Sequence, residues 1–158
     1  MKTMMKSGIA LLLFATICAA FKSATPADHR DKLEYFQGTF EQALKKAQQE
    51  NKPIFMDAYT SWCGWCKELD KRTFSDQTLA DYMNNHFINV KMDMESGEGE
   101  KLGSKYDVSA YPTLLFIHQN GRLAHRIEGF MQAPAMLEEV KFAEKKLERL
   151  DRIEQRDK

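Results

Sequence analysis

The spacing of the cysteines constrains this chain more than any other feature. Only three are present, Cys18, Cys63 and Cys66, and the last two form a C-x-x-C pair. A disulfide across so short a loop restricts the unfolded chain very little, so the pair is not a structural scaffold. The 158-residue chain must therefore fold around a hydrophobic core, and its 43% hydrophobic and 29% charged residues suffice for a single domain. The pair is instead a candidate for chemistry.

The N-terminus has the pattern of a secretory signal. Lys2 and Lys6 precede an uncharged stretch at 9–20, which is shorter than the roughly 20 apolar residues that span a bilayer. Small residues at Cys18 and Ala20 suit cleavage near Ala20. We therefore expect residues 1–20 to be a signal peptide, and the protein to be exported, in a bacterium to the periplasm.

Cys18 also allows a second interpretation, a lipid anchor. The residue before an acylated cysteine is normally small, whereas Ile17 stands there, so cleavage is favoured over a membrane tether. Residues 21–32 are polar and lack periodicity, which is typical of a linker, and residues 33–158 carry the patterned sequence of one domain. If Cys18 leaves with the signal, the mature protein keeps a single cysteine pair.

The charge balance excludes one class of partner. Lys plus Arg and Asp plus Glu both number 23, so the formal net charge is zero. A polyanion-binding domain carries an excess of basic residues, which this chain lacks. We therefore expect no nucleic acid partner.

Hydrophobic periodicity, caps and turn residues predict alternating helices and strands. Thr39 and Gln42 fit a capping box, Asp57 is the one acidic residue in an apolar run, and Asn120-Gly121 is a strong hairpin signal. Helices are predicted at 39–50, from the cysteines to 72, at 76–85, at 98–105 and from Pro134 onward, and strands at 54–59, 87–93, 113–118 and 122–127, with a possible extra strand at 34–37. This order favours an α/β fold in which helices flank both faces of a central mixed sheet.

The helix after the strand at 54–59 places the cysteines on its first turn. Unpaired N–H groups and the helix dipole favour negative charge there, which lowers the pKa of Cys63 below the value of about 8.5 for a free thiol. Cys66 lies one turn further on the same side and can attack a mixed disulfide formed at Cys63. This geometry makes Cys63 the attacking thiol and Cys66 the resolving thiol.

Other interpretations of the motif remain open. A C-x-x-C pair is also half of a zinc site, but the histidines, His29, His86, His118 and His125, offer no second ligand pair at zinc spacing. A structural disulfide is a further alternative. Trp62 and Trp65 could belong to the core, although two tryptophans beside a reactive thiol favour a binding rim. We expect no metal and no organic cofactor.

The segment Trp62-Cys63-Gly64-Trp65-Cys66-Lys67, on a helix after a buried strand, resembles the active site of the thioredoxin superfamily. The resemblance covers about residues 33–150 and is greatest to exported thioredoxin-like proteins and to the C-terminal domain of periplasmic electron-transferring disulfide reductases. It implies a thioredoxin fold for the domain at 33–158 and a redox-active disulfide between the two cysteines.

The resemblance also assigns residues outside the motif. Asp57 matches the buried aspartate of thioredoxins, Lys91 the lysine beside it, and Tyr111-Pro112-Thr113 the cis-proline segment. Burial should raise the pKa of the Asp57 carboxyl, and a lysine should partly counter this, which suits proton exchange with Cys66 near neutral pH. Each assignment has an alternative: Asp57 could serve only to stabilise the fold, and Lys91 could be a solvated strand residue. The Tyr111-Pro112 bond could be trans, in an ordinary turn.

The function implied is thiol–disulfide exchange with protein substrates, in which Trp62, Gly64, Trp65, Tyr111 and Pro112 bind the substrate. Trp65 stands where oxidising and isomerising members carry histidine, so the pair is expected to act as a reductase. A reductase outside the cytoplasm needs a membrane electron donor. We expect a monomer. The alternatives are an oxidase or isomerase, or a non-catalytic client-binding module, for example in cytochrome c maturation.

Overall fold

The computed structural model of the protein describes residues 32–156. The predicted signal peptide, Cys18 and most of the predicted linker lie outside these residues. Within residues 32–156, no helix combines the length and the apolar character needed to cross a membrane.

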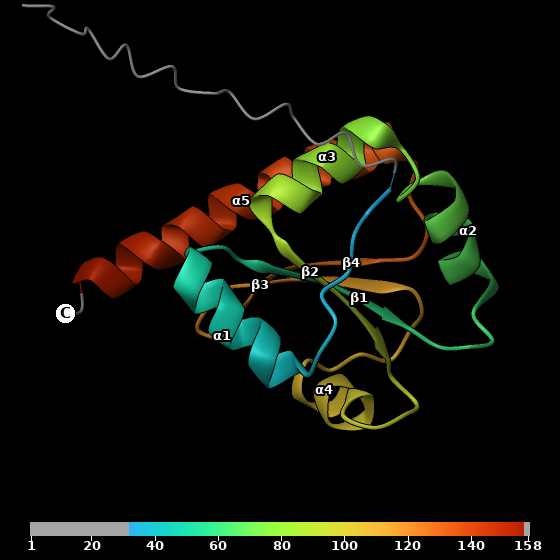
Figure 1. Ribbon diagram of the computed structural model, residues 1–158, viewed down its shortest axis with the longest axis horizontal. Helices are drawn as coiled ribbons and strands as arrows, with labels where there is room; N and C mark the ends of the chain where they lie inside the picture. The colour runs from blue at the N-terminus through green and yellow to red at the C-terminus, as the bar shows by residue number, and fades with distance from the viewer. Residues whose placement is uncertain (1–31, 157–158) are drawn as a thin grey trace, which may run out of the picture.

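A four-stranded mixed sheet forms the centre of the fold (Figure 1). Its strands are β1 (Ile54–Tyr59), β2 (Ile88–Asp93), β3 (Thr113–Ile117) and β4 (Leu123–Glu128). They lie in the order β2-β1-β3-β4, with β1 parallel to β2 and β3 antiparallel to both β1 and β4. The prediction of a mixed sheet is confirmed. Strand β1 is an inner strand, and every residue from Ile54 to Ala58 is buried.

Five helices cover the sheet on both faces: α1 (Phe40–Glu50), α2 (Gly64–Arg72), α3 (Gln77–His86), α4 (Gly99–Lys105) and α5 (Ala133–Arg156). Helices α1 and α4 pack on one face, against the cluster that contains Met56 and Leu115. Helices α2, α3 and α5 pack on the other face, against the cluster that contains Phe55 and Phe116 (Figure 1). Neighbouring strand residues thus alternate between two cores.

Local chemistry sets the helix ends. The Thr39 hydroxyl accepts from the Gln42 backbone N–H and the Gln42 side chain accepts from the Thr39 N–H, which completes the predicted capping box of α1. Asn51 ends this helix in the left-handed conformation. Asp76 caps α3 through the Leu79 N–H, as expected. The predicted helices and strands therefore agree with the structure to within one or two residues at their ends.

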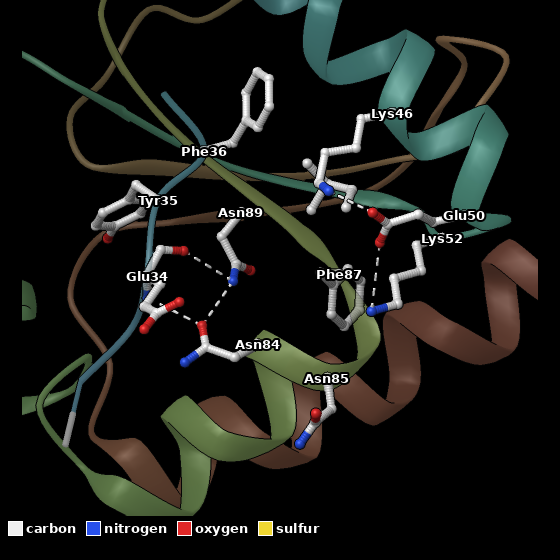
Figure 2. Close-up of a pocket in the computed structure, with 11 residues that line it drawn as sticks. Glu34, Tyr35, Phe36, Lys46, Glu50, Lys52, Asn84, Asn85, Phe87 and Asn89 are labelled. Atoms are coloured by element: carbon white, nitrogen blue, oxygen red, sulfur yellow. Dashed lines mark hydrogen bonds and ion pairs between the residues drawn. The ribbon is translucent and has the colours of Figure 1, made fainter. Parts of the chain in front are cut away.

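The possible extra strand at 34–37 is wrong. This segment runs extended beside the outer edge of β2, and within residues 32–156 the backbone bond recorded between the two joins Phe36 N–H to the Asn89 carbonyl at 2.8 Å. Side-chain amides take the other positions: Glu34 N–H donates to Asn84 Oδ1 at 3.0 Å, and Asn89 Nδ2 donates to the Glu34 carbonyl at 3.2 Å (Figure 2). Because amides occupy these backbone groups, no ladder forms. A polar pocket lies between the segment and the C-terminal ends of α1 and α3.

Candidate active site

The two cysteines lie at the N-terminus of α2, as predicted. Cys63 is the N-cap residue, and its Sγ accepts a hydrogen bond from the Cys66 N–H at 3.1 Å. The sulfurs form a disulfide, with Cα atoms 5.4 Å apart. Both residues are nearly buried, with 4% and 2% of their surface exposed. A negative charge on Cys63 would therefore face the backbone donors and the positive end of the helix dipole.

Asp57 lies on β1 and is fully buried. Its partner Lys91 occupies the opposite position on the parallel strand β2, and the Lys91 Nζ donates to Asp57 Oδ2 at 2.9 Å. Burial raises the pKa of the Asp57 carboxyl to about 6, and the opposing positive charge of Lys91 limits the rise. The structure thus brings together the predicted pair and gives the carboxyl a pKa suited to proton exchange near neutral pH.

Lys91 is not a solvated strand residue. Its Nζ also donates to Oδ1 of Asp70, a half-exposed residue on α2, so one ammonium bridges a buried and an exposed carboxylate. Burial works to lower the pKa of Lys91, but the two carboxylates outweigh it and the pKa is raised. The rings of Tyr35 and Tyr59 lie 5.4 and 5.0 Å from the ammonium. Lys91 is therefore held in its charged form.

The Tyr111-Pro112 peptide bond is cis, as the resemblance implied. The register Ala58↔Thr113 places Pro112 at the end of the sheet where the chain leaves β1 for the cysteines. The Pro112 carbonyl accepts from the Gly129 N–H at 2.8 Å. The ring of Trp62 meets the ring of Tyr111 edge-on at 5.8 Å, which joins this loop to the segment that carries Cys63.

Exposed aromatic side chains flank the cysteines. Trp62 and Trp65 are 65% and 61% exposed, which excludes the interpretation that they are core residues. The Trp62 indole donates to Glu95 Oε2 at 2.8 Å, and Trp65 packs on the ring of Phe130 at 5.6 Å. Aromatic rings that stay exposed beside a nearly buried disulfide are suited to hold a protein segment.

Gly64 is exposed and is the first residue of α2. A Cβ at this position would meet no heavy atom within 4 Å. The packing of the domain therefore does not require glycine here, and the space above Gly64 is open to an approaching partner.

Sequence reasoning missed four residues of this site: Tyr35, Asp70, Glu95 and Phe130. Asp70 could have been found, because it follows Cys63 by seven residues and so lies on the same face of α2 two turns later. The other three reach the site only through tertiary structure, from the segment before α1, the loop after β2 and the loop after β4.

The comparisons with known proteins agree on one family. The family model Thioredox_DsbH, described as a protein of unknown function, DUF255, matches residues 26–101. The thiol:disulfide interchange protein DsbD of Campylobacter jejuni is 30% identical over 121 residues, which are 76% of this chain and 21% of that protein. The DsbD protein of Yersinia pestis is 34% identical over 97 residues, or 60% of this chain and 16% of that protein. The chain thus spans about a fifth of the length of these relatives.

Solved structures show the likeness over about 70% of the chain. A candidate disulphide-isomerase from Bacteroides thetaiotaomicron is 49% identical, with a TM-score of 0.66, and the match covers 72% of this chain and 93% of that one. The oxidised C-terminal domain of Neisseria meningitidis DsbD is 20% identical, with a TM-score of 0.58, and the match covers 70% of this chain and 98% of that domain. The match to the Neisseria meningitidis domain shows a shared fold. The match to the Bacteroides thetaiotaomicron protein shows similarity in sequence as well as in fold.

Proposed function

Since the chain belongs to the thioredoxin superfamily and is related to the DsbD proteins, we propose that it is a thiol–disulfide oxidoreductase that exchanges its Cys63–Cys66 pair with protein substrates. One observation carries this proposal: the disulfide lies at the N-terminus of α2, where Cys63 caps the helix. A structural disulfide has no need of that position, whereas a nucleophilic thiolate does.

In the reducing direction the reaction has two exchange steps. The Cys63 thiolate attacks one sulfur of a substrate disulfide, a mixed disulfide forms, and the other substrate sulfur leaves as a thiolate that takes up a proton. Cys66 then loses its proton and attacks Cys63 Sγ, which releases the second substrate thiolate and closes the Cys63–Cys66 disulfide. The substrate gains two electrons and the protein loses two.

Asp57 is proposed as the group that accepts the proton of Cys66. A carboxyl whose pKa is about 6 is largely ionised at neutral pH and can still be protonated without a large cost. Lys91 keeps the ionised form stable inside the protein through its 2.9 Å bond to Oδ2.

The substrate is proposed to bind across the exposed face around the disulfide. Trp62 and Trp65 supply apolar contact on the two sides, and Gly64 leaves room between them for a close backbone approach. Tyr111 and Pro112 form the opposite wall, since Trp62 packs against Tyr111. An extended substrate segment is the shape that fits this arrangement.

The direction of electron flow is proposed to be reduction, outside the cytoplasm. The lack of histidine at Trp65 removes a group that would stabilise the reduced thiolate and make the pair a stronger oxidant. The N-terminal pattern and the relation to DsbD support an exported domain at 33–158, which would receive electrons from a membrane donor. We propose a monomer, because in residues 32–156 only Leu123 and Phe142 are large exposed apolar residues away from the cysteines.

Trapping experiments test the roles of the two cysteines. With Cys66→Ser the mixed disulfide cannot be resolved, so protein substrates should accumulate bound to Cys63 and appear as shifted bands in non-reducing gels. The matched variant Cys63→Ser should trap none. Trapping by Cys63→Ser in place of Cys66→Ser would reverse the role assignment.

A redox titration tests the direction. Equilibration of the mature domain with glutathione buffers should give a potential near that of thioredoxin, about −270 mV. A value near that of a strong oxidase, about −120 mV, would favour the alternative of oxidation or isomerisation. That alternative has its own support, since a relative with 49% identity is described as a disulphide-isomerase.

A further inference from the structure

Tyr35 lies next to the proton-transfer pair, although it comes from the irregular segment before α1. Its ring is half-buried and lies 5.4 Å from the Lys91 ammonium. Its hydroxyl oxygen and Oδ1 of Asp57 are both buried, and neither makes a hydrogen bond of ordinary geometry among the described residues, although each lies close enough to affect the titration of the other. An orphaned donor and an orphaned acceptor in one buried site demand an explanation, because an unpaired buried polar atom is costly.

The two groups lie close enough to affect each other. Burial is the main cause that raises the pKa of Tyr35, and the Asp57 carboxylate raises it further, so the phenol stays protonated. In return the Tyr35 hydroxyl acts to lower the pKa of Asp57, against the larger effect of burial. A phenol that keeps its proton is a permanent donor to a carboxylate.

The backbone on both sides of Tyr35 is held in place. Glu34 is bound through its N–H to Asn84 Oδ1 and through its carbonyl to Asn89 Nδ2, and the Phe36 N–H donates to the Asn89 carbonyl. Asn89 Nδ2 also donates to Asn84 Oδ1 at 3.0 Å, which ties the two amides together. Figure 2 shows these amides on one side of the segment and the Tyr35 ring projecting to the other side. The amides therefore orient Tyr35.

A cavity of about 310 Å³ reaches this site from outside. Tyr35, Lys91 and Asp70 line it together with Lys32, Leu33 and Phe74, whereas Asp57 is not among its lining residues. Tyr35 and Lys91 thus stand at the boundary between the cavity and the buried carboxyl.

We propose that Tyr35 is a positioning residue for the proposed proton transfer: it shields Asp57 from the cavity and donates its hydroxyl proton in a hydrogen bond to Oδ1 when Asp57 is ionised. Lys91 then holds Oδ2 and Tyr35 holds Oδ1, so that the carboxylate keeps one orientation. The inference rests on the proposed role of Asp57. The other charged groups that bear on Asp57 are Lys91 on β2 and Asp70 on α2.

Two substitutions at Tyr35 should shift the pKa of Asp57 in opposite directions. Tyr35→Phe removes the hydroxyl donor but keeps the ring that separates Asp57 from the cavity. The pKa of Asp57 should therefore rise by about one unit, the effect of one hydrogen bond to a charged group. Tyr35→Ala opens the cavity to the carboxyl, and hydration should lower the pKa from its value of about 6. Tyr59→Phe is the matched control, because Tyr59 also lies near Lys91 but is not among the groups that shift the pKa of Asp57.

The measurement is a carbon-13 NMR titration of the Asp57 carboxyl in the disulfide form, in which the cysteines do not titrate. The expected result is a rise with Tyr35→Phe, a fall with Tyr35→Ala and no change with Tyr59→Phe. An unchanged pKa in Tyr35→Phe, or shifts of the same sign in both Tyr35 variants, would overturn the proposal.

The same variants connect the site to turnover. In stopped-flow reduction of a disulfide substrate, the pH of half-maximal rate for Tyr35→Phe should move in the same direction as the Asp57 pKa. A pH profile that stays in place while the pKa moves would show that Tyr35 does not position the proton acceptor. Failure of the proposed function itself would be seen separately, as a lack of substrate trapping by Cys66→Ser.

Discussion

Asp57→Asn should make the protein more stable at neutral pH while it slows the chemistry. The carboxyl has an ordinary pKa of 3.8, and burial raises the pKa to about 6 in the folded protein. At about pH 2 the group is protonated in both states. Between that pH and about 6 the unfolded chain releases its proton while the folded protein keeps it, so stability falls as the pH rises and stays lower above this interval.

The magnitude follows from the shift. A difference between 3.8 and about 6 in the pKa of Asp57 corresponds to about 3 kcal/mol of unfolding free energy lost by the wild-type protein between about pH 2 and pH 8. Asparagine has nearly the same shape and no charge to bury, and Lys91 keeps its partner Asp70. The free energy of unfolding of Asp57→Asn should therefore rise, relative to that of the wild-type protein, by about that amount over this pH range.

Urea unfolding of the disulfide form at a series of pH values measures this effect. A change of about 3 kcal/mol moves the midpoint by about 1 to 3 M urea. Glu148→Gln, at an exposed position of α5, is the control, and its stability should stay within about 0.5 kcal/mol of the wild-type value at each pH. If the difference between Asp57→Asn and the wild-type protein does not depend on pH, the buried carboxyl does not have a raised pKa and the proton-transfer argument fails.

Two further predictions concern the surroundings of the disulfide. Lys91→Gln removes the positive charge opposite Asp57, so the pKa of Asp57 should rise further and the pH profile of turnover should move to higher pH. The control Lys71→Gln, at the exposed end of α2, should leave the pH profile in place, and a shift to lower pH in Lys91→Gln would refute this role of Lys91. Trp65→Ala should keep the melting temperature and lower kcat/KM for protein disulfides about tenfold, the cost of one aromatic contact. Phe142→Ala, at an exposed position of α5, should leave kcat/KM unchanged, and equal activity in both variants would show that Trp65 is not part of the binding surface.

Much of the fold could be predicted because its determinants are local. Thr39 and Asp76 cap the helices that they precede, and Asn51 ends the first one. The apolar run at 54–59 is a buried strand, and Asn120-Gly121 lies in the turn between β3 and β4. Caps, turns and hydrophobic periods act over a few residues, so these elements follow from the sequence nearby. The segment at 34–37 has the composition of a strand, but the amides of Asn84 and Asn89 come from distant positions and take its backbone groups.

The cysteine motif and its place on the first turn of α2 follow from residue types and spacing, and the resemblance to the thioredoxin superfamily picked out Asp57, Lys91 and Pro112. Only the tertiary structure decides that Lys91 bridges Asp57 to Asp70, that Trp65 rests on Phe130 and that Tyr35 lies beside Lys91. The reason is physical. The identity of a nucleophile and its helix dipole are local properties of the chain, whereas the pKa of Asp57 depends on burial and on charges that only the folded sheet brings together.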